Sequence, residues 1–183
     1  PVPAALAGPD PVQVAYVAVT EDQVATYFQR LYGPSGSTIH TNISFTSAGD
    51  GVIVYYDHWE DGFEADIANP VQGSTQVWGD GDLTNGVAPG YPSDLINSGD
   101  TVILENDIPT PRNAGVTFYD GGDKIGSTRG IAITRAAWPL SPGVVAAAAT
   151  SVYDTSRYGT SFTVPVGQNT PGAQQGTSSG MFD

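Results

Sequence analysis

Five carboxylates lie close together in the segment from residue 57 to residue 66 of this chain. They are Asp57, Glu60, Asp61, Glu64 and Asp66. Carboxylate oxygens at this spacing are hard ligands that a loop can fold around Ca²⁺. The pattern therefore predicts a calcium site. The alternative is that these acids are solvated turn residues, because turn geometry also favours Asp.

A second acidic stretch, residues 80–86, begins with the D-x-D spacing of a calcium loop. Asp80 and Asp82 would be its first ligands. Its glycine stands one place late, however, and its twelfth position is Tyr91 rather than a bidentate glutamate, so the stretch departs from an EF-hand. It is the weaker of the two calcium candidates.

Histidine and lysine suggest two further kinds of site. His58 lies among the acids and could bind a transition metal, with His40 brought near it by strand pairing, although paired histidines are more often surface neighbours. Lys124 is the only lysine, and an intramolecular isopeptide bond with Asn106 or Asn113 would give a mass deficit of one ammonia.

Aromatic residues close to the acids could form a platform for sugars. Trp59, Trp78 and Tyr91 are the main candidates, with Trp138 as a fourth ring. Aromatic faces stack on sugar rings, so a shared exposed surface would indicate a carbohydrate-binding module. The alternative is that these rings fill the core or a sheet edge.

Catalysis needs a constellation of groups that the sequence does not supply. Glu60 with Glu64, or Asp57 with Glu60, could serve as the acid and base of a glycosidase, but pairs of acids are easily found among nineteen. The chain has no G-x-S-x-G, P-loop, G-x-G-x-x-G or H-E-x-x-H motif. We therefore expect a protein that is not an enzyme.

The charge balance restricts the partners. The 183 residues include six Lys and Arg against nineteen Asp and Glu, a net charge of -13. Nucleic acid would be repelled by such a surface, and no apolar run is long enough to insert into a membrane. With so few cations, Arg112 and Arg135 are expected either to pair with acids or to serve surface solubility. Other copies of the chain, other surface proteins and glycans remain as partners.

One helix is predicted, over residues 21–32. Thr20 can cap it, Gln23 stands at capping-box spacing, and apolar residues recur at helical spacing from Val24 to Leu31. A strand is predicted before it, at Val12–Val19.

Period-two patterning dominates the rest of the chain. Residues 38–45 and 52–58 alternate on either side of a Gly- and Asp-containing turn, which predicts an antiparallel hairpin. Residues 93–97 suggest one helical turn, and the alanines at 146–149 leave helix open as an alternative to strand. The weaker predicted strands are 75–78, 101–106, 116–119, 123–128, 131–136, 144–152 and 160–166.

These elements predict a mainly β domain, a sandwich or barrel-like body of short antiparallel strands with one short packed helix. Abundant glycine (23) and proline (14) fit strands joined by turns. We expect an extended Pro-rich arm at 1–11, the β-rich domain at 12–167, and a Gly/Ser/Gln-rich linker or long loop at 168–183, cut from a longer protein.

Several segments resemble known families. Residues 54–64, 76–81 and 102–109 are similar to segments of large bacterial extracellular proteins with DUF11-like surface repeats, and residues 131–135 and 158–167 loosely resemble the N-terminal domain of IgGFc-binding proteins. The resemblance implies a β-rich adhesive or structural module with no catalytic residues. We therefore expect a secreted or cell-surface structural or adhesive module, in one form a self-assembling filament subunit. A carbohydrate-binding module is the alternative.

Overall fold

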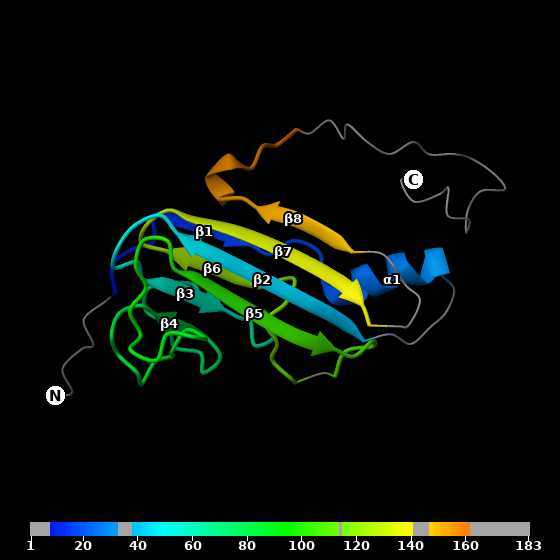
Figure 1. Ribbon diagram of the computed structural model, residues 1–183, viewed down its shortest axis with the longest axis horizontal. Helices are drawn as coiled ribbons and strands as arrows, with labels where there is room; N and C mark the ends of the chain where they lie inside the picture. The colour runs from blue at the N-terminus through cyan, green and yellow to red at the C-terminus, as the bar shows by residue number, and fades with distance from the viewer. Residues whose placement is uncertain (1–7, 33–37, 114, 141–146, 162–183) are drawn as a thin grey trace.

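The computed structural model describes residues 8–32, 38–113, 115–140 and 147–161 (Figure 1). Two four-stranded antiparallel sheets face each other, so the prediction of a mainly β sandwich is confirmed. The first sheet has the order β1 (Gln13–Tyr16), β6 (Lys124–Ser127), β3 (Val54–Asp57), β4 (Gln76–Trp78). The second has the order β5 (Thr101–Ile108), β2 (Ile39–Ser47), β7 (Ile131–Pro139), β8 (Ala148–Val152).

The main core lies between the two sheets because each central strand turns alternate apolar side chains inward. Ile43 and Phe45 of β2 meet Tyr56 of β3 and Trp78 of β4 there, and all four are fully buried. Phe45 stacks on Trp78 with ring centroids 6.1 Å apart. This packing fixes the face of β3 from which Tyr56 points into the interior.

The predicted helix forms as α1, Glu21–Tyr32. The side chain of Gln23 accepts a hydrogen bond from the Thr20 N–H at 3.1 Å, which is half of the expected capping box. The apolar face of α1 packs against the second sheet where β2 begins and β7 ends. There Val24 and Phe28 contact a small cluster with Ile39 and Ala137.

The predicted hairpin between residues 38–45 and 52–58 is wrong. Both segments form strands, but β2 pairs with β5 and β7 in the second sheet, whereas β3 pairs with β4 and β6 in the first. The turn after β2 carries the chain across the sandwich, and its backbone bonds extend the pairing of each strand with its own partner: Ala48 N–H donates to Gly130, next to β7, and Thr128 N–H, next to β6, donates to Ile53. Both strands are central, so each already has two other partners.

Other boundaries also differ from prediction. Residues 116–119 form a loop, residues 93–97 are not helical, and the first strand is shorter than 12–19. Ala148 and Ala149 belong to β8, so the helical alternative fails for them, while residues 144–146 and 162–166 lie outside the described residues. Of the expected arm, Gly8 and Pro9 lie on the first sheet, where Tyr55 Oη donates to the Pro9 carbonyl at 2.8 Å.

Candidate functional site

The acidic segment after β3 covers the outer face of the first sheet and does not gather its carboxylates around one point. Each of the five predicted calcium ligands has its own partners. Asp57 accepts from the Glu64 N–H and Thr75, Glu60 contacts Arg112, Asp61 accepts from Ser74, Glu64 accepts from the N–H groups of Val71 and Gln72, and Asp66 accepts from Ala68 and Asn69. The five therefore act separately, as anchors of turns and loop backbone.

The second predicted calcium stretch is likewise held by local bonds. Asp80 accepts from the Asp82 N–H at 2.8 Å, and Asp82 accepts from the Thr84 N–H at 2.9 Å. These are Asx turns, for which Asp is favoured without any ion. The buried Asp94, which sequence reasoning missed, accepts from the backbone N–H groups of Gly79, Asp80 and Gly81 and so fixes the start of this stretch.

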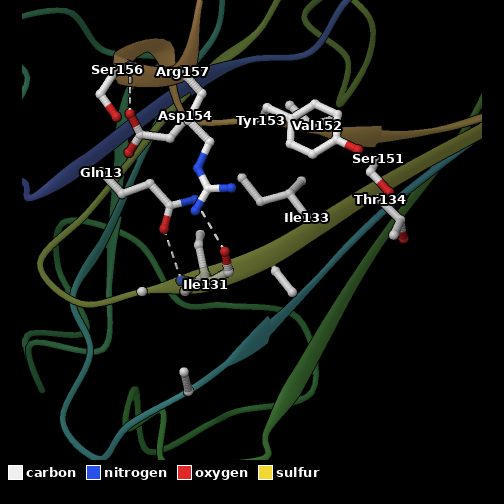
Figure 2. Close-up of a pocket in the computed structure, with 13 residues that line it drawn as sticks. Gln13, Ile131, Ile133, Thr134, Ser151, Val152, Tyr153, Asp154, Ser156 and Arg157 are labelled. Atoms are coloured by element: carbon white, nitrogen blue, oxygen red, sulfur yellow. Dashed lines mark hydrogen bonds between the residues drawn. The ribbon is translucent and has the colours of Figure 1, made fainter.

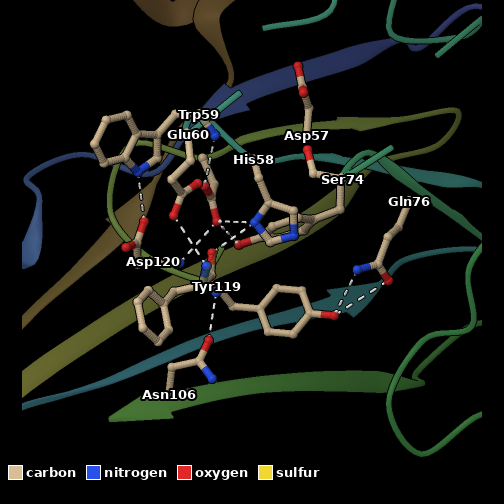
Figure 3. Close-up of polar contacts among 12 residues, drawn as sticks. Asp57, His58, Trp59, Glu60, Ser74, Gln76, Asn106, Tyr119 and Asp120 are labelled. Carbon is tan, nitrogen blue, oxygen red and sulfur yellow. Dashed lines mark hydrogen bonds and ion pairs between the residues drawn. The ribbon is translucent and has the colours of Figure 1, made fainter. Parts of the chain in front are cut away.

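The richest arrangement of titratable groups is a buried polar cluster, which we define as His58, Trp59, Glu60, Arg112, Asp120 and Asp123. Figure 3 labels four of these residues, His58, Trp59, Glu60 and Asp120. The segment after β3 supplies the first three residues, and the loop between β5 and β6 supplies the others. Asp123 is central and fully buried. Its carboxylate accepts from Tyr56 Oη at 2.7 Å, from the Asp120 N–H at 2.9 Å and from the Trp59 N–H at 3.3 Å.

Arg112 closes the cluster on its outer side. Its Nη2 lies 2.6 Å from Glu60 Oε1 and 2.7 Å from Asp120 Oδ2. The guanidinium also stands over the Trp59 ring, 4.7 Å from its centroid, and 5.5 Å from that of Phe118. A planar cation between two rings and two acids is held in a single geometry. The expected pairing of Arg112 with acids is thus confirmed.

Trp59 is fixed from both sides. Its indole N–H donates to Asp120 Oδ1 at 3.0 Å (Figure 3). Gly122 passes directly beneath the ring: a Cβ at this position would lie 2.6 Å from Trp59 Cδ1, and the residue has φ +116°. Glycine is therefore required there both for space and for backbone conformation.

Burial and neighbouring charges shift the pKa values of two groups in the cluster, Asp120 and His58. Burial raises the pKa of Asp120 to about 8, helped by the charges of Asp123 and Glu21 and opposed by Arg112. Burial alone would lower the pKa of His58, but its contacts with Asp123 and the Phe118 carbonyl outweigh burial and raise it. His58 thus tends toward the cation beside the Asp123 carboxylate, while Asp120 tends toward the neutral acid.

A second buried ion pair lies between the cluster and α1. Glu21 and Arg135 form a short contact through Glu21 Oε1, and both side chains are almost completely buried. Glu21 Oε2 accepts from the Gly121 N–H at 3.0 Å, which links the helix to the loop that carries Asp120. The expected pairing of Arg135 with an acid is confirmed.

His58, Glu60 and Asp123 bring ligand atoms within 4.8 Å of one another, and they are the one such group that the described ranges contain. Several of their atoms are already engaged, because His58 Nδ1 contacts the Phe118 carbonyl at 2.8 Å and Glu60 Oε1 contacts Arg112, whereas Glu60 Oε2 is buried without a hydrogen-bond partner. The neighbouring guanidinium also opposes a second cation. His40 is not part of the group: it lies in the other sheet, 2.6 Å from Asp107. The cluster is an internal ion-pair network rather than a set of free ligands.

The predicted aromatic platform is not assembled. Trp78 is fully buried in the core, so it has no face to offer a sugar. Trp59 is covered by Arg112, and Tyr91 packs on the core with its Oη donating to the Thr101 carbonyl. Trp138 lies across the second sheet against His40.

Open space lies instead along β8. One groove of about 590 Å³ lies between β7, β8 and the 3-10 turn η1 (Thr155–Arg157), and Arg157 extends into it (Figure 2). A second, of about 600 Å³, is lined by Tyr16, Tyr153 and Tyr158 with residues of β8. The sequence carried no local signal for either groove, because their walls come from segments that lie far apart in the chain.

Comparison with models of known protein families, with curated proteins and with solved structures finds no match to this chain. The resemblance to bacterial surface proteins therefore stays a prediction. In the described part of the chain, no helix combines the length and apolar character needed to cross a membrane. The fold and the cluster define an antiparallel β-sandwich whose interior carboxylates are paired within the protein.

Proposed function

We propose that this protein is an extracellular structural or adhesive module of a bacterial cell surface, and that it associates with copies of itself through the edge of β8. The observation that carries the proposal is the character of this edge. No described strand pairs with the outer side of β8, and the residues from Ala148 to Ser151 are exposed and uncharged. An unpaired, neutral strand edge is a template for another strand.

The other three sheet edges are protected. β5 carries the exposed acids Glu105 and Asp107 at its edge. β4 is covered by a loop, since the Val77 N–H donates to the Asn85 carbonyl, and β1 forms a bridge from Ala15 to Asp154. Charges and covering loops are the usual devices that prevent edge pairing. Among the residues described, the outer edge of β8 has neither charges nor a covering loop, which favours association of copies at this edge.

The state of the interior supports a structural role over catalysis. Asp123 and Arg112 are held by several partners each, and both contribute to packing rather than to an open cleft. A chain without cysteine also gains stability when copies assemble.

Sedimentation velocity and light scattering across a range of concentrations test this proposal, with negative-stain imaging for filaments. We expect the average mass of the wild type to rise with concentration. Ala149→Lys places a charge at the β8 edge without touching either groove and should keep the chain monomeric. Ile103→Lys on β5, at the opposite edge of the same sheet, is the matched control and should associate like the wild type. A wild type that stays monomeric at every concentration contradicts the proposal.

A second candidate function is glycan binding in the tyrosine-lined groove. Tyr153 and Tyr158 are 59% and 52% exposed and share this groove with Tyr16. Exposed aromatic rings in a concave surface suit the faces of sugar rings. Here the platform differs from the one expected at Trp59, Trp78 and Tyr91.

Titration with a panel of soluble glycans, followed by tyrosine and tryptophan fluorescence and by NMR, tests this second function. Tyr153→Ala and Tyr158→Ala should abolish any response. Tyr27→Ala changes another exposed tyrosine, on α1, and should leave the response intact. If no glycan perturbs the wild-type spectra, the groove is not a sugar site.

A further inference from the structure

The only lysine of the chain is buried opposite a buried aspartate. Lys124 on β6 and Asp57 on β3 are direct cross-strand partners at the centre of the first sheet. Their side chains leave the sheet on its outer face, beneath the acidic segment. The Asp57 side chain is fully buried and that of Lys124 is 11% exposed, with Lys124 Nζ 4.0 Å from Asp57 Oδ2.

One residue of the covering loop binds both side chains. Lys124 Nζ donates to the Glu64 carbonyl at 3.0 Å, and the Glu64 N–H donates to Asp57 Oδ2 at 2.9 Å. Thr75 Oγ1 donates to the other carboxyl oxygen, Oδ1, at 3.1 Å. Two donors therefore fix the position of the Asp57 carboxyl group. The Lys124 amine lies beside it at the end of a flexible side chain.

We propose that Lys124 and Asp57 condense into an intramolecular amide that links β6 to β3. The uncharged amine nitrogen attacks Cγ of the protonated Asp57 carboxyl group. The new N–C bond forms as the C–O bond to the hydroxyl group breaks, and the hydroxyl leaves as water with a proton from the amine. Nothing is oxidised or reduced, so no co-reactant is needed.

The surroundings favour each part of this reaction. The reaction needs an uncharged amine and an uncharged carboxyl group, and transfer of one proton between the two facing side chains produces this pair. Burial also raises the pKa of Asp57, although hydrogen bonds from Glu64 and Thr75 and the charge of Lys124 oppose the rise. The carboxyl oxygen that stays in the amide keeps one of these donors, the Thr75 hydroxyl on Oδ1 or the Glu64 N–H on Oδ2, and this donor is placed to stabilise that oxygen in the tetrahedral intermediate.

The partner differs from Asn106 and Asn113, the residues that the sequence suggested. The Asn106 side chain is occupied elsewhere, because its Oδ1 accepts from the Tyr119 N–H at 2.6 Å. The leaving group becomes water instead of ammonia. This proposal is independent of the proposed function, since the bond would form within each copy whatever its surface binds.

Intact-mass measurement on the purified, folded full chain tests the proposal. We expect the mass to be lower than that of the sequence by one water molecule. Endoproteinase Lys-C, which cleaves after free lysine, should then leave the denatured chain uncut, because its single lysine is acylated. A full-mass chain that Lys-C cleaves into two fragments overturns the proposal.

Variants separate this bond from other dehydrations. Asp-Gly sequences such as Asp61-Gly62 can lose water as succinimides, and that loss would persist in Lys124→Arg. The proposed amide predicts full mass for Lys124→Arg and Asp57→Ala, whereas Asp57→Asn should lose ammonia and still resist Lys-C. A deficit that survives Lys124→Arg contradicts the proposal. The wild-type mass and digestion decide the question even if a variant fails to fold.

Discussion

Arg112 is the cation on which the buried polar cluster depends, so its removal should destabilise the protein strongly. Arg112→Ala leaves Glu60 and Asp120 without their shared partner. It also opens space between the Trp59 and Phe118 rings. Both acids lie where water has little access: the Glu60 side chain is 12% exposed and that of Asp120 is fully buried.

The size of the effect follows from these contacts. Removing one partner of a buried ion pair costs about 3–5 kcal/mol, because the other charge stays buried without compensation. Loss of the cation over the Trp59 face adds about 1 kcal/mol. Protonation of Asp120 relieves part of the penalty, so we expect a net loss of about 4 kcal/mol in the free energy of unfolding. Whole domains are stable by only about 5–15 kcal/mol.

Urea unfolding followed by tryptophan fluorescence measures this loss. Arg129→Ala is the matched control, because Arg129 is an exposed arginine and its replacement should change stability by less than about 0.5 kcal/mol. Adding Glu60→Gln to Arg112→Ala should restore at least about 1 kcal/mol, whereas Glu60→Gln alone should destabilise. A loss below about 1 kcal/mol for Arg112→Ala, or no recovery in the double variant, would refute the reasoning.

Three further predictions concern other buried acids. The pKa of Asp120 is about 8 in the folded protein against 3.8 for an unperturbed aspartate, so the folded state binds the proton more tightly. The stability that Asp120 contributes through this proton is complete below about pH 4 and is lost as pH rises toward 8. Asp120→Asn should therefore flatten the decline of the urea unfolding midpoint between pH 5 and pH 8. An unchanged slope contradicts this prediction. Asp94→Ala removes the acceptor for three backbone donors and should cost about 3 kcal/mol in urea unfolding, with the exposed Asp82→Ala nearly neutral. Glu21→Gln leaves Arg135 uncompensated and should lower stability by about 3 kcal/mol, whereas Asp22→Asn in the same helical turn should not; equal effects would count against a special role for the buried pair.

Local patterns were sufficient to predict many elements but not their partners. The helix at Glu21–Tyr32 follows from its cap and its apolar spacing, and both act within a few residues. The alternation of Ile39, Ile43 and Phe45 indicates which face of β2 is buried. This alternation does not indicate which strands lie on the two sides of β2. The pairing of β2 with β5 and β7 instead of β3 therefore could not be deduced.

The candidate site shows the same limit. The shortage of cations predicted that Arg112 and Arg135 would find acids, yet it did not say which ones. Asp120 and Asp123 lie about sixty residues from His58 in the sequence, within a turn-like Asp-Gly-Gly-Asp segment that suggests only a loop. Their burial results from long-range packing of this loop beneath Trp59, for which the sequence has no local signal.

The charge distribution leads to a last prediction about assembly. Half of the six cations lie beside interior acids, namely Arg112, Lys124 and Arg135. Because only the other three cations remain to balance the remaining acids of a chain with a net charge of -13, the surface is strongly negative. Two copies must overcome this repulsion when neutral β8 edges approach. Screening shortens the range of the repulsion from about 10 Å at 0.1 M salt to about 3 Å at 1 M. Self-association measured by sedimentation should therefore strengthen with sodium chloride, while Ala149→Lys should stay monomeric throughout. Association that weakens as salt rises would mean that charged groups hold the copies together, and the neutral β8 edge would then not be the contact.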